Sequence, residues 1–252
     1  MRLQQHSDVV QSRAQLVLQH ARTPAEIAEA QQLRYKVFAE EMGARVPGRE
    51  IATDSDEFDL YCDHLLVRDV DTQRVVGTYR LLSGAMAHRT GGFYSDREFD
   101  LARLDHLRDE MVEVGRSCVH SAYRTGATIT LLWSGITQYM QTYGYRYVIG
   151  CASIGIADGG RVAAAVYNKL QKTSLSPAEY RVFPRCELPL ATPDPAVEAA
   201  LPPLIKGYIR IGAYICGAPA WDPDFNTADL LMMLPMSRME PRYARHFLKA
   251  DR

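Results

Sequence analysis

Residues 113–136 read EVGRSCVHSAYRTGATITLLWSGI and place a glutamate, an arginine and a small-residue turn in front of an apolar segment. The run MVEVGRSCV predicts a strand over 111–119, and apolar residues at helical spacing predict a helix over 128–143 that ends at Gly144. The start of a helix exposes unpaired backbone N–H groups and the positive end of the helix dipole. A strand that runs through a tight turn into a helix is therefore a candidate seat for a phosphate group.

The turn itself, YRTGAT, supplies residue types that suit an anion. Gly126 and Ala127 let a ligand approach the backbone, Arg124 adds a positive charge, and Thr128 is predicted to cap the helix. The GK[ST] of a nucleotide P-loop and the GxGxxG of a dinucleotide site are both missing. A pantetheine arm, with a diphosphate or a single phosphate, needs fewer phosphate contacts than either nucleotide site. The alternative is an ordinary helix start after a turn, which would show the same residues without binding a ligand.

The remaining elements must position this seat. Thr23-Pro24 predicts the start of a helix that stops at Gly43, and a polar, acidic segment over 44–62 predicts a long functional loop. The further elements predicted are a strand at 15–21, a hairpin at 63–70 and 74–82, an irregular region to about 109, a strand at 145–153, a helix at 161–172, an irregular strand at 181–189, a final strand at 228–234 and a terminal helix at 239–248.

Residues 201–217, LPPLIKGYIRIGAYICG, allow two interpretations. We predict a helix from the proline pair to Ile211 with Gly212 as its C-cap, followed by a strand; alternation of Lys206, Tyr208 and Arg210 would fit a strand instead. The element order predicts a mixed sheet covered by helices. We expect a single domain over residues 1–252, in which the Pro- and Ala-rich segment 190–203 is an internal linker.

Composition excludes several classes of function. The net charge of −1 argues against a general nucleic-acid-binding surface, which would need a cationic excess. Five scattered cysteines without a CxxC pair fit reduced thiols, and the seven histidines form no HxxxH or HxH pattern, so no metal site is expected. The chain shows neither a signal-peptide pattern nor an apolar run near the ~18 residues of a membrane span. We expect a cytoplasmic protein, compatible with peripheral contact on the inner face of the membrane.

Motifs over most of residues 30–235 resemble those of a known family. The chain looks like a GNAT-superfamily ornithine–acyl-carrier-protein N-acyltransferase, related to N-acyl amino acid synthases and acyl-homoserine lactone synthases and also labelled hemolysin-like. The motifs are LRYKVF, CDHLLV, VGTYRLL, EVGRSCVHSAYR, LLWSGI, LPPLIKGYIRIGA and PAWDPDFNTADLLMML. The resemblance implies an α/β (α+β) fold, with a GNAT-like mixed, mainly antiparallel sheet, helices on both faces and a C-terminal extension.

The implied reaction moves a long-chain, optionally 3-hydroxylated, acyl group from acyl carrier protein to the α-amino group of ornithine, which gives lyso-ornithine lipid. The resemblance makes Glu113 the candidate base and Arg116 its catalytic partner, with an ion pair between them as the alternative. Strand parity puts the two on opposite faces, so we predict a bulge at Gly115 that brings them together. Cys118 and His120 share parity, but a free cysteine on a buried strand is usually core and this reaction needs no covalent intermediate.

Other residues are implied to bind substrates. Arg34 and Arg80 are candidates for gripping the acceptor carboxylate, unless they pair with the acidic loop at 57–59 and shape the site. A carboxylate of WDPDFNTAD is a candidate partner for the side-chain ammonium of ornithine, although aspartate also forms turns. The expected phosphopantetheine-binding residues are Arg124, Gly126, Ala127 and Thr128, and the expected substrate-binding residues are Arg34, Phe38, Glu57, Asp59, Arg80 and Asp222.

No permanently bound cofactor is expected. The donor is the acyl-4′-phosphopantetheine of acyl carrier protein, with coenzyme A as an alternative, and the acidic carrier is expected to dock on basic residues (Arg124, Arg161, Lys169 and Lys172). Alternatives are an N-acyl amino acid synthase acting on glycine, lysine, glutamine or tyrosine, and a catalytically silent lipid-binding or hemolysin-like protein. Oligomeric state and acyl length are not readable from the sequence.

Overall fold

The computed structural model describes residues 15–46, 48–189, 200–243 and 247. Their helices and strands are β1 (Leu16–His20), α1 (Pro24–Tyr35), β2 (Asp63–Asp69), β3 (Val75–Ser83), α2 (Gly84–Arg89), β4 (Phe99–Asp100), β5 (Met111–Val119), α3 (Ala127–Tyr143), β6 (Tyr147–Gly155), α4 (Arg161–Thr173), β7 (Phe183–Pro184), α5 (Pro203–Ile211), β8 (Tyr214–Ile215), β9 (Ala220–Asp222) and β10 (Thr227–Pro235). Short 3-10 turns join several of them.

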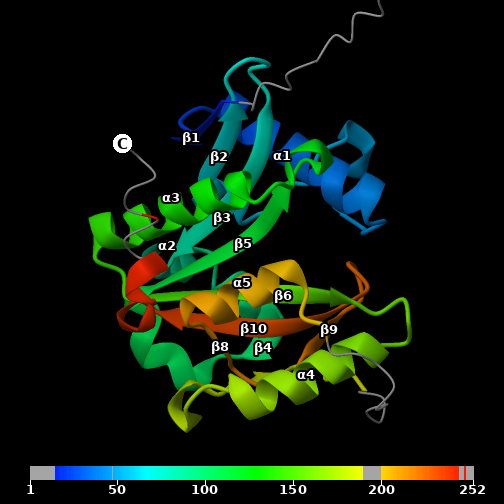
Figure 1. Ribbon diagram of the computed structural model, residues 1–252, viewed down its shortest axis with the longest axis vertical. Helices are drawn as coiled ribbons and strands as arrows, with labels where there is room; N and C mark the ends of the chain where they lie inside the picture. The colour runs from blue at the N-terminus through cyan, green and yellow to red at the C-terminus, as the bar shows by residue number, and fades with distance from the viewer. Residues whose placement is uncertain (1–14, 47, 190–199, 244–246, 248–252) are drawn as a thin grey trace, which may run out of the picture.

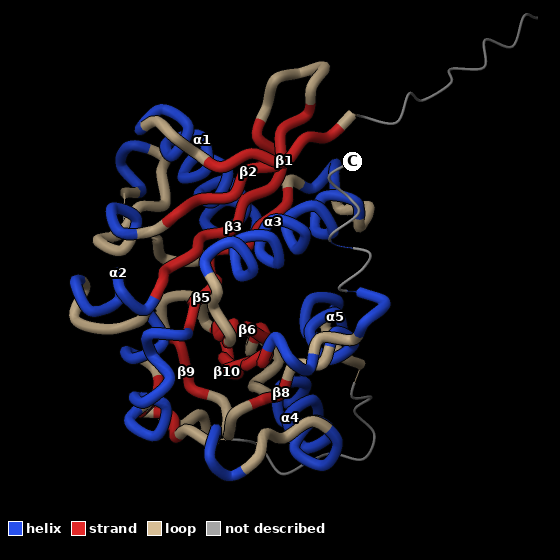
Figure 2. Tube along the Cα trace, turned by 90° about the vertical axis from the view of Figure 1, so that its left-hand side faces the viewer, coloured by secondary structure: helices blue, strands red, loops and turns tan. Residues whose placement is uncertain are grey.

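The main sheet has the strand order β1-β2-β3-β5-β6-β10-β8, with β9 paired to β10. Its neighbours are antiparallel except β5 and β6, so the prediction of a mixed, mainly antiparallel sheet is confirmed. Figure 2 shows α1 and α2 on one side of the sheet and α3, α4 and α5 on the other. The larger core lies on the second side, where apolar residues of α3, α4 and α5 pack on β5, β6 and β10.

The two parallel strands separate after a short paired stretch. β5 and β6 pair only from Met111 with Tyr147 to Glu113 with Ile149. The backbones then approach closely at Gly150, where an added Cβ would lie 2.3 Å from the carbonyl oxygen of Val114. Beyond that point they diverge (Figure 1), so the middle of the sheet is open where β5 has no partner on the β6 side.

A β-bulge lies in β5 directly after Gly115, which is two residues past Glu113. Thr78 of β3 pairs with Cys118 and Arg80 pairs with Gly115, so Tyr79 alone faces two residues of β5. Of those two, Arg116 has φ 50°, in the left-handed region that ordinary side chains avoid. The bulge we predicted is present, but Arg116 carries the unusual conformation that we expected of Gly115.

Several element predictions need correction. The helix interpretation of 201–211 is confirmed as α5, so the strand alternative is wrong. The irregular region before 109 contains α2 and β4, and the short β9 was not predicted. The helix that begins with α1 continues as a π-helix, η1 (Lys36–Glu41), instead of an α-helix. Most of the proposed linker 190–203 and part of the terminal helix lie outside the described residues.

Candidate active site

Two neighbouring cavities lie along the open part of the sheet. The β5–β6 cavity, about 650 Å³, is lined by β5 from Glu113 onward, by Cys151 and Ser153 of β6 and by Asp229 of β10. The α3–α5 cavity, about 590 Å³, lies between the start of α3 and α5. The two share Ser117, Cys118, Val119, Arg124, Pro203 and Leu204 along their linings. The two cavities therefore have part of their walls in common.

Glu113 lines the β5–β6 cavity and is only 5% exposed. Its carboxylate accepts hydrogen bonds from the backbone N–H groups of Tyr94 (2.6 Å) and Ser95 (2.8 Å) and from the Ser95 hydroxyl. Burial raises the pKa of Glu113, and these hydrogen bonds and Arg80 oppose the rise. A carboxylate with a raised pKa inside a cavity is a suitable general base.

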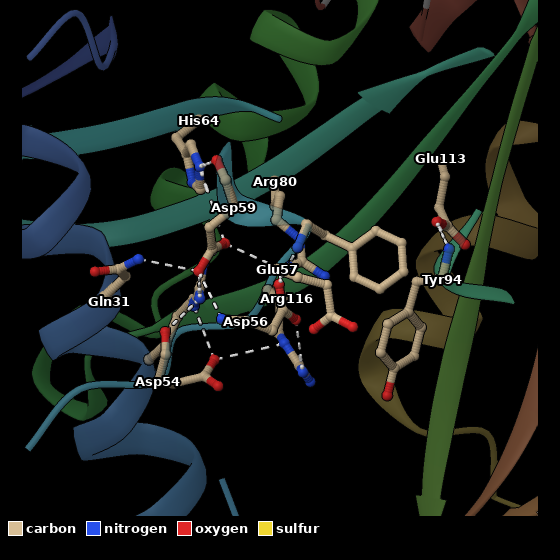
Figure 3. A network of polar contacts seen from close by, with 12 residues as sticks. Gln31, Asp54, Asp56, Glu57, Asp59, His64, Arg80, Tyr94, Glu113 and Arg116 are labelled. Atoms are coloured by element: carbon tan, nitrogen blue, oxygen red, sulfur yellow. Dashed lines mark hydrogen bonds and ion pairs between the residues drawn. The ribbon is translucent and has the colours of Figure 1, made fainter. Parts of the chain in front are cut away.

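Arg116 also lines this cavity, but it does not pair with Glu113. Its guanidinium lies 3.2 Å from Asp56 and 3.5 Å from Asp54 and is stacked between the rings of Tyr94 and Phe225. Figure 3 shows Arg116 among these carboxylates while Glu113 stands apart at Tyr94. The alternative of a Glu113–Arg116 ion pair is therefore wrong for this structure.

Arg34 is fully buried and its donors are occupied. It bonds the Asp54 carboxylate (2.8 Å), both oxygens of Asp59 (2.9 and 2.7 Å) and the Asp54 carbonyl. Arg80 bonds Asp56 (2.6 Å) and Asp59 (3.0 Å) and keeps a place in the cavity lining. The role we predicted for Arg34, gripping the acceptor carboxylate, is wrong, because Arg34 is fully buried and each of its three guanidinium nitrogens donates to Asp54 or Asp59.

The acidic loop contributes differently from our prediction. Asp59 pairs with both arginines as expected, whereas Glu57 is exposed and pairs with Arg97 on the surface. Arg34 and Arg80 lower the pKa of Asp59 against the effect of its burial, so this carboxylate stays ionised. Glu57 is therefore removed from the predicted site. Sequence reasoning missed Asp54 and Asp56, which the DSDEFD run opposite several arginines could have indicated.

The start of α3 forms part of the α3–α5 cavity. Gly126 is the N-cap, with φ 90°. The space next to its Cα is open, since an added Cβ would meet nothing within 4 Å. Ala127 is the first helical residue, and no side chain in the described part of the chain caps the helix. Thr128 does not cap it: the side chain is buried and donates to the Tyr123 carbonyl at 3.1 Å. The first-turn N–H groups of α3 are thus left for a ligand by the protein's own side chains.

Basic groups surround that helix start. Arg124 lines both cavities, donates to the Val119 carbonyl at 3.0 Å and pairs with Glu41. Arg210 of α5 lines the α3–α5 cavity from the opposite side and was not predicted as a site residue. Arg210 lies at this cavity because its segment forms the helix α5 and not a strand. The arrangement suits a phosphate that is held by backbone N–H groups and two guanidinium groups.

The remaining predicted residues lie in the β5–β6 cavity. Phe38 sits on the π-helix η1, lines the cavity and packs edge-on against Phe225. Asp222 lines it from β9, while one carboxylate oxygen accepts from the N–H groups of Asp224 (2.8 Å) and Phe225 (3.1 Å). Asp222 is thus both the turn former and a cavity residue. Deviations to π-helix often occur at functional sites.

A buried carboxylate cluster, defined here as Glu98, Asp222 and Asp229, adjoins this cavity. Burial, and then the neighbouring carboxylates, raise the pKa of Glu98 to about 9 and that of Asp229 to about 6. Glu98 lies in the region that we predicted only as irregular. Ligand atoms of Glu98, Asp229 and the Cys151 thiol lie within 4.8 Å of one another among the described residues.

The raised pKa of Glu98 predicts a pH effect on stability. Its folded pKa exceeds the ordinary 4.5, so its stabilising contribution is complete below about pH 4.5 and is lost as pH rises through about 9. Between pH 6 and 9 we expect the wild-type melting temperature to fall by at least about 2–4 °C more than that of Glu98→Gln, the shift for about 1 kcal/mol. Thermal unfolding at several pH values tests this. Equal slopes for the two proteins would contradict it, and the exposed Glu57→Gln serves as the control.

No helix within the described ranges combines the length and hydrophobicity needed to cross a bilayer.

Comparison with known proteins places the chain among acyltransferases. Residues 33–134 match the acetyltransferase (GNAT) domain model. The chain is 39% identical over 259 residues to the L-ornithine N(alpha)-acyltransferase of Rhizobium meliloti (strain 1021), covering 96% of this chain and 87% of that protein. It is 39% identical over 245 residues to the enzyme of the same name from Agrobacterium fabrum (strain C58), covering 90% of this chain and 83% of that protein.

Solved structures share the fold at low sequence identity. FeeM, an N-acyl amino acid synthase from uncultured soil microbes, superposes with a TM-score of 0.53 at 12% identity, covering 88% of this chain and 93% of that one. The acyl-homoserine lactone synthase LasI superposes with a TM-score of 0.51 at 13% identity, covering 88% of this chain and 91% of that one. The predicted GNAT-like architecture is therefore confirmed.

Proposed function

The chain belongs to the L-ornithine N(alpha)-acyltransferase family, and from this premise we propose that it transfers a long-chain acyl group from acyl carrier protein to the α-amino group of ornithine. The product is lyso-ornithine lipid. The observation that carries the proposal is the position of Glu113, a buried carboxylate with a raised pKa, in a cavity that shares lining residues with the cavity at the open start of α3. A catalytically silent lipid-binding protein would have no use for such a base.

The donor arm fits the two cavities as follows. The phosphate of phosphopantetheine binds at the start of α3 near Gly126, between Arg124 and Arg210. The thioester lies beside β5 past the bulge, where the strand has no partner on the β6 side and its N–H groups can stabilise an oxyanion. The acyl chain occupies the apolar part of the α3–α5 cavity, along Ile129, Trp133 and Leu204.

The acceptor enters the β5–β6 cavity. Arg116 faces it with a guanidinium that has room for a further partner, and it binds the α-carboxylate of the amino acid. The α-amine then lies next to Glu113. Glu113 removes a proton as the nitrogen attacks the thioester carbonyl, the C–N bond forms, the C–S bond breaks, and the thiolate leaves with a proton from the same carboxyl group. Fixing both reactants in this geometry supplies about 7–11 kcal/mol of the barrier reduction.

A substrate screen tests this proposal. The purified protein is incubated with palmitoyl- or 3-hydroxypalmitoyl-acyl carrier protein and single amino acids, and products are identified by mass spectrometry. We expect an N-acyl product with ornithine. Product only with glycine, lysine, glutamine or tyrosine would reassign the acceptor, and thioester binding without turnover would support the silent lipid-binding protein instead. Palmitoyl-coenzyme A in the same assay distinguishes the two donors.

The phosphate seat predicts how a substitution of Arg124 acts. Arg124 is half-exposed and forms an ion pair with Glu41, so its contribution to carrier binding is moderate. Its loss should raise KM for acyl carrier protein about 3- to 10-fold with little change in kcat, and it should reduce the salt dependence of kcat/KM. Steady-state kinetics of Arg124→Ala at several ionic strengths measures both. Arg161→Ala on α4 is the control: a larger effect there would move carrier docking to the α4 face.

A further inference from the structure

The described residues make no ion pair with Glu98, Asp222 or Asp229, in contrast to Asp54, Asp56 and Asp59, which are matched by three arginines. Asp222 and Asp229 are 8% and 4% exposed. Burial raises the pKa of Glu98 to about 9, so this carboxyl group is protonated in the free protein, and a positively charged ligand would stabilise its ionised form.

Glu98 points to a ligand independently of the cluster's charge. Both of its carboxylate oxygens are buried and accept no hydrogen bond from the described residues. One of these oxygens lies within 4.8 Å of ligand atoms of Cys151 and Asp229, which line the β5–β6 cavity. Buried polar atoms are nearly always hydrogen-bonded in native proteins, so an unpartnered carboxylate at the edge of a substrate cavity indicates a donor that arrives with the substrate.

The cluster lies on the same face of the sheet as the base. Glu113 pairs with Ile149 of β6, and Asp229 pairs with Ser153, four positions further along the same strand. The Ser95 hydroxyl joins the two regions, since it donates to Glu113 and lies 3.4 Å from the Cys151 thiol. An acceptor whose α-amine meets Glu113 can therefore extend its side chain along β6 to the cluster.

We propose that Glu98, Asp222 and Asp229 bind the side-chain ammonium of a diamino acid and thereby select ornithine over neutral amino acids of the same length. This inference rests on the proposed function. An ammonium brings several N–H donors, which suits three neighbouring carboxyl groups of which Glu98 accepts no hydrogen bond from the described residues. A metal ion fits less well, because burial raises the pKa of the Cys151 thiol well above its ordinary value and keeps the sulfur neutral.

The test compares ornithine with norvaline, which has the same carbon chain but no side-chain amine. With palmitoyl-acyl carrier protein as donor, wild-type kcat/KM should favour ornithine by at least about 30-fold, the loss expected when a buried charge partner is removed. Glu98→Gln and Asp229→Asn should each lower kcat/KM for ornithine by a similar factor, through KM, and leave norvaline within about 3-fold. The exposed Asp224→Asn should keep the wild-type ratio.

The other possible results of these assays each support or overturn the inference. An unchanged ornithine-to-norvaline ratio in both variants, or an equal loss with both acceptors, would overturn the inference while N-acylation of ornithine by the wild type upholds the proposed function. Loss of wild-type activity in EDTA, restored by a divalent metal, would replace the ammonium by a metal ion. Calorimetric titration of ornithine into each folded variant gives the same comparison without turnover, with binding weakened about 30-fold or more in support and unchanged binding against it.

Discussion

Glu113→Gln lowers kcat for N-acylation of ornithine by about 10²- to 10⁴-fold, the range of a general base. The variant keeps the length of the side chain but has no basic oxygen to take the amine proton. Wild-type kcat/KM should rise with pH as the buried carboxyl, whose pKa lies above its ordinary range, becomes ionised. In the variant this acid limb disappears. Rate measurements across pH with saturating donor test both effects.

The design must allow for a change in stability. Both oxygens of Glu113 accept backbone N–H groups, so the amide of glutamine faces one of those donors at a cost of about 1–3 kcal/mol. Melting temperatures are therefore measured alongside. Ser95→Ala separates chemistry from folding: it removes a hydrogen bond that lowers the pKa of Glu113, so the acid limb should move to higher pH. A folded Glu113→Gln protein with near-wild-type turnover would remove Glu113 from the role.

Arg116→Gly is expected to lower kcat/KM for ornithine by at least about 30-fold, chiefly through KM. The guanidinium faces the β5–β6 cavity, and its loss removes the charged partner of the acceptor carboxylate. Glycine is the suitable replacement because Arg116 has φ 50°, which glycine adopts without strain, so the bulge is retained. Steady-state kinetics with ornithine varied at fixed donor measures the effect.

Two further variants sharpen this prediction. Arg116→Lys keeps the charge but not the planar pair of donors, and it should fall between glycine and wild type. Arg97→Ala removes a surface arginine that also stacks on an aromatic ring and should leave kcat/KM unchanged. If Arg116→Gly keeps its KM for ornithine while kcat alone drops, Arg116 does not bind the acceptor in the ground state.

Local patterns in the sequence predicted most of the fold. The short apolar runs of β2, β3 and β5, the proline at the start of α1 and the glycines that end α3 and α5 are short-range signals, and the structure follows them. The segment between β3 and β5 was not predictable in this way. Its 3-10 turn at Tyr94–Arg97 forms around the carboxylate of Glu113, a contact that no periodicity reveals.

For the candidate site too, the residues in local motifs were predicted, and the contacts made only in the folded protein were not. Glu113, Arg116 and Asp222 were predicted from motifs that resemble those of a family, and Gly126 was predicted from the small-residue turn before a helix. All four line the cavities. The role given to Arg34 was wrong because sequence spacing does not show that Asp54 and Asp59 occupy its donors. Glu98 was missed because it comes to Asp229 only through tertiary packing.

The most direct measurement is a crystal structure of the protein with ornithine and a non-cleavable acyl-phosphopantetheine analogue, in which an amide replaces the thioester. We predict that the phosphate lies within hydrogen-bonding distance of the first N–H groups of α3, and that the α-nitrogen lies about 2.6–3.2 Å from Glu113 or is joined to it by one water. A phosphate bound away from that helix start, or an α-nitrogen separated from Glu113 by protein side chains, would contradict it.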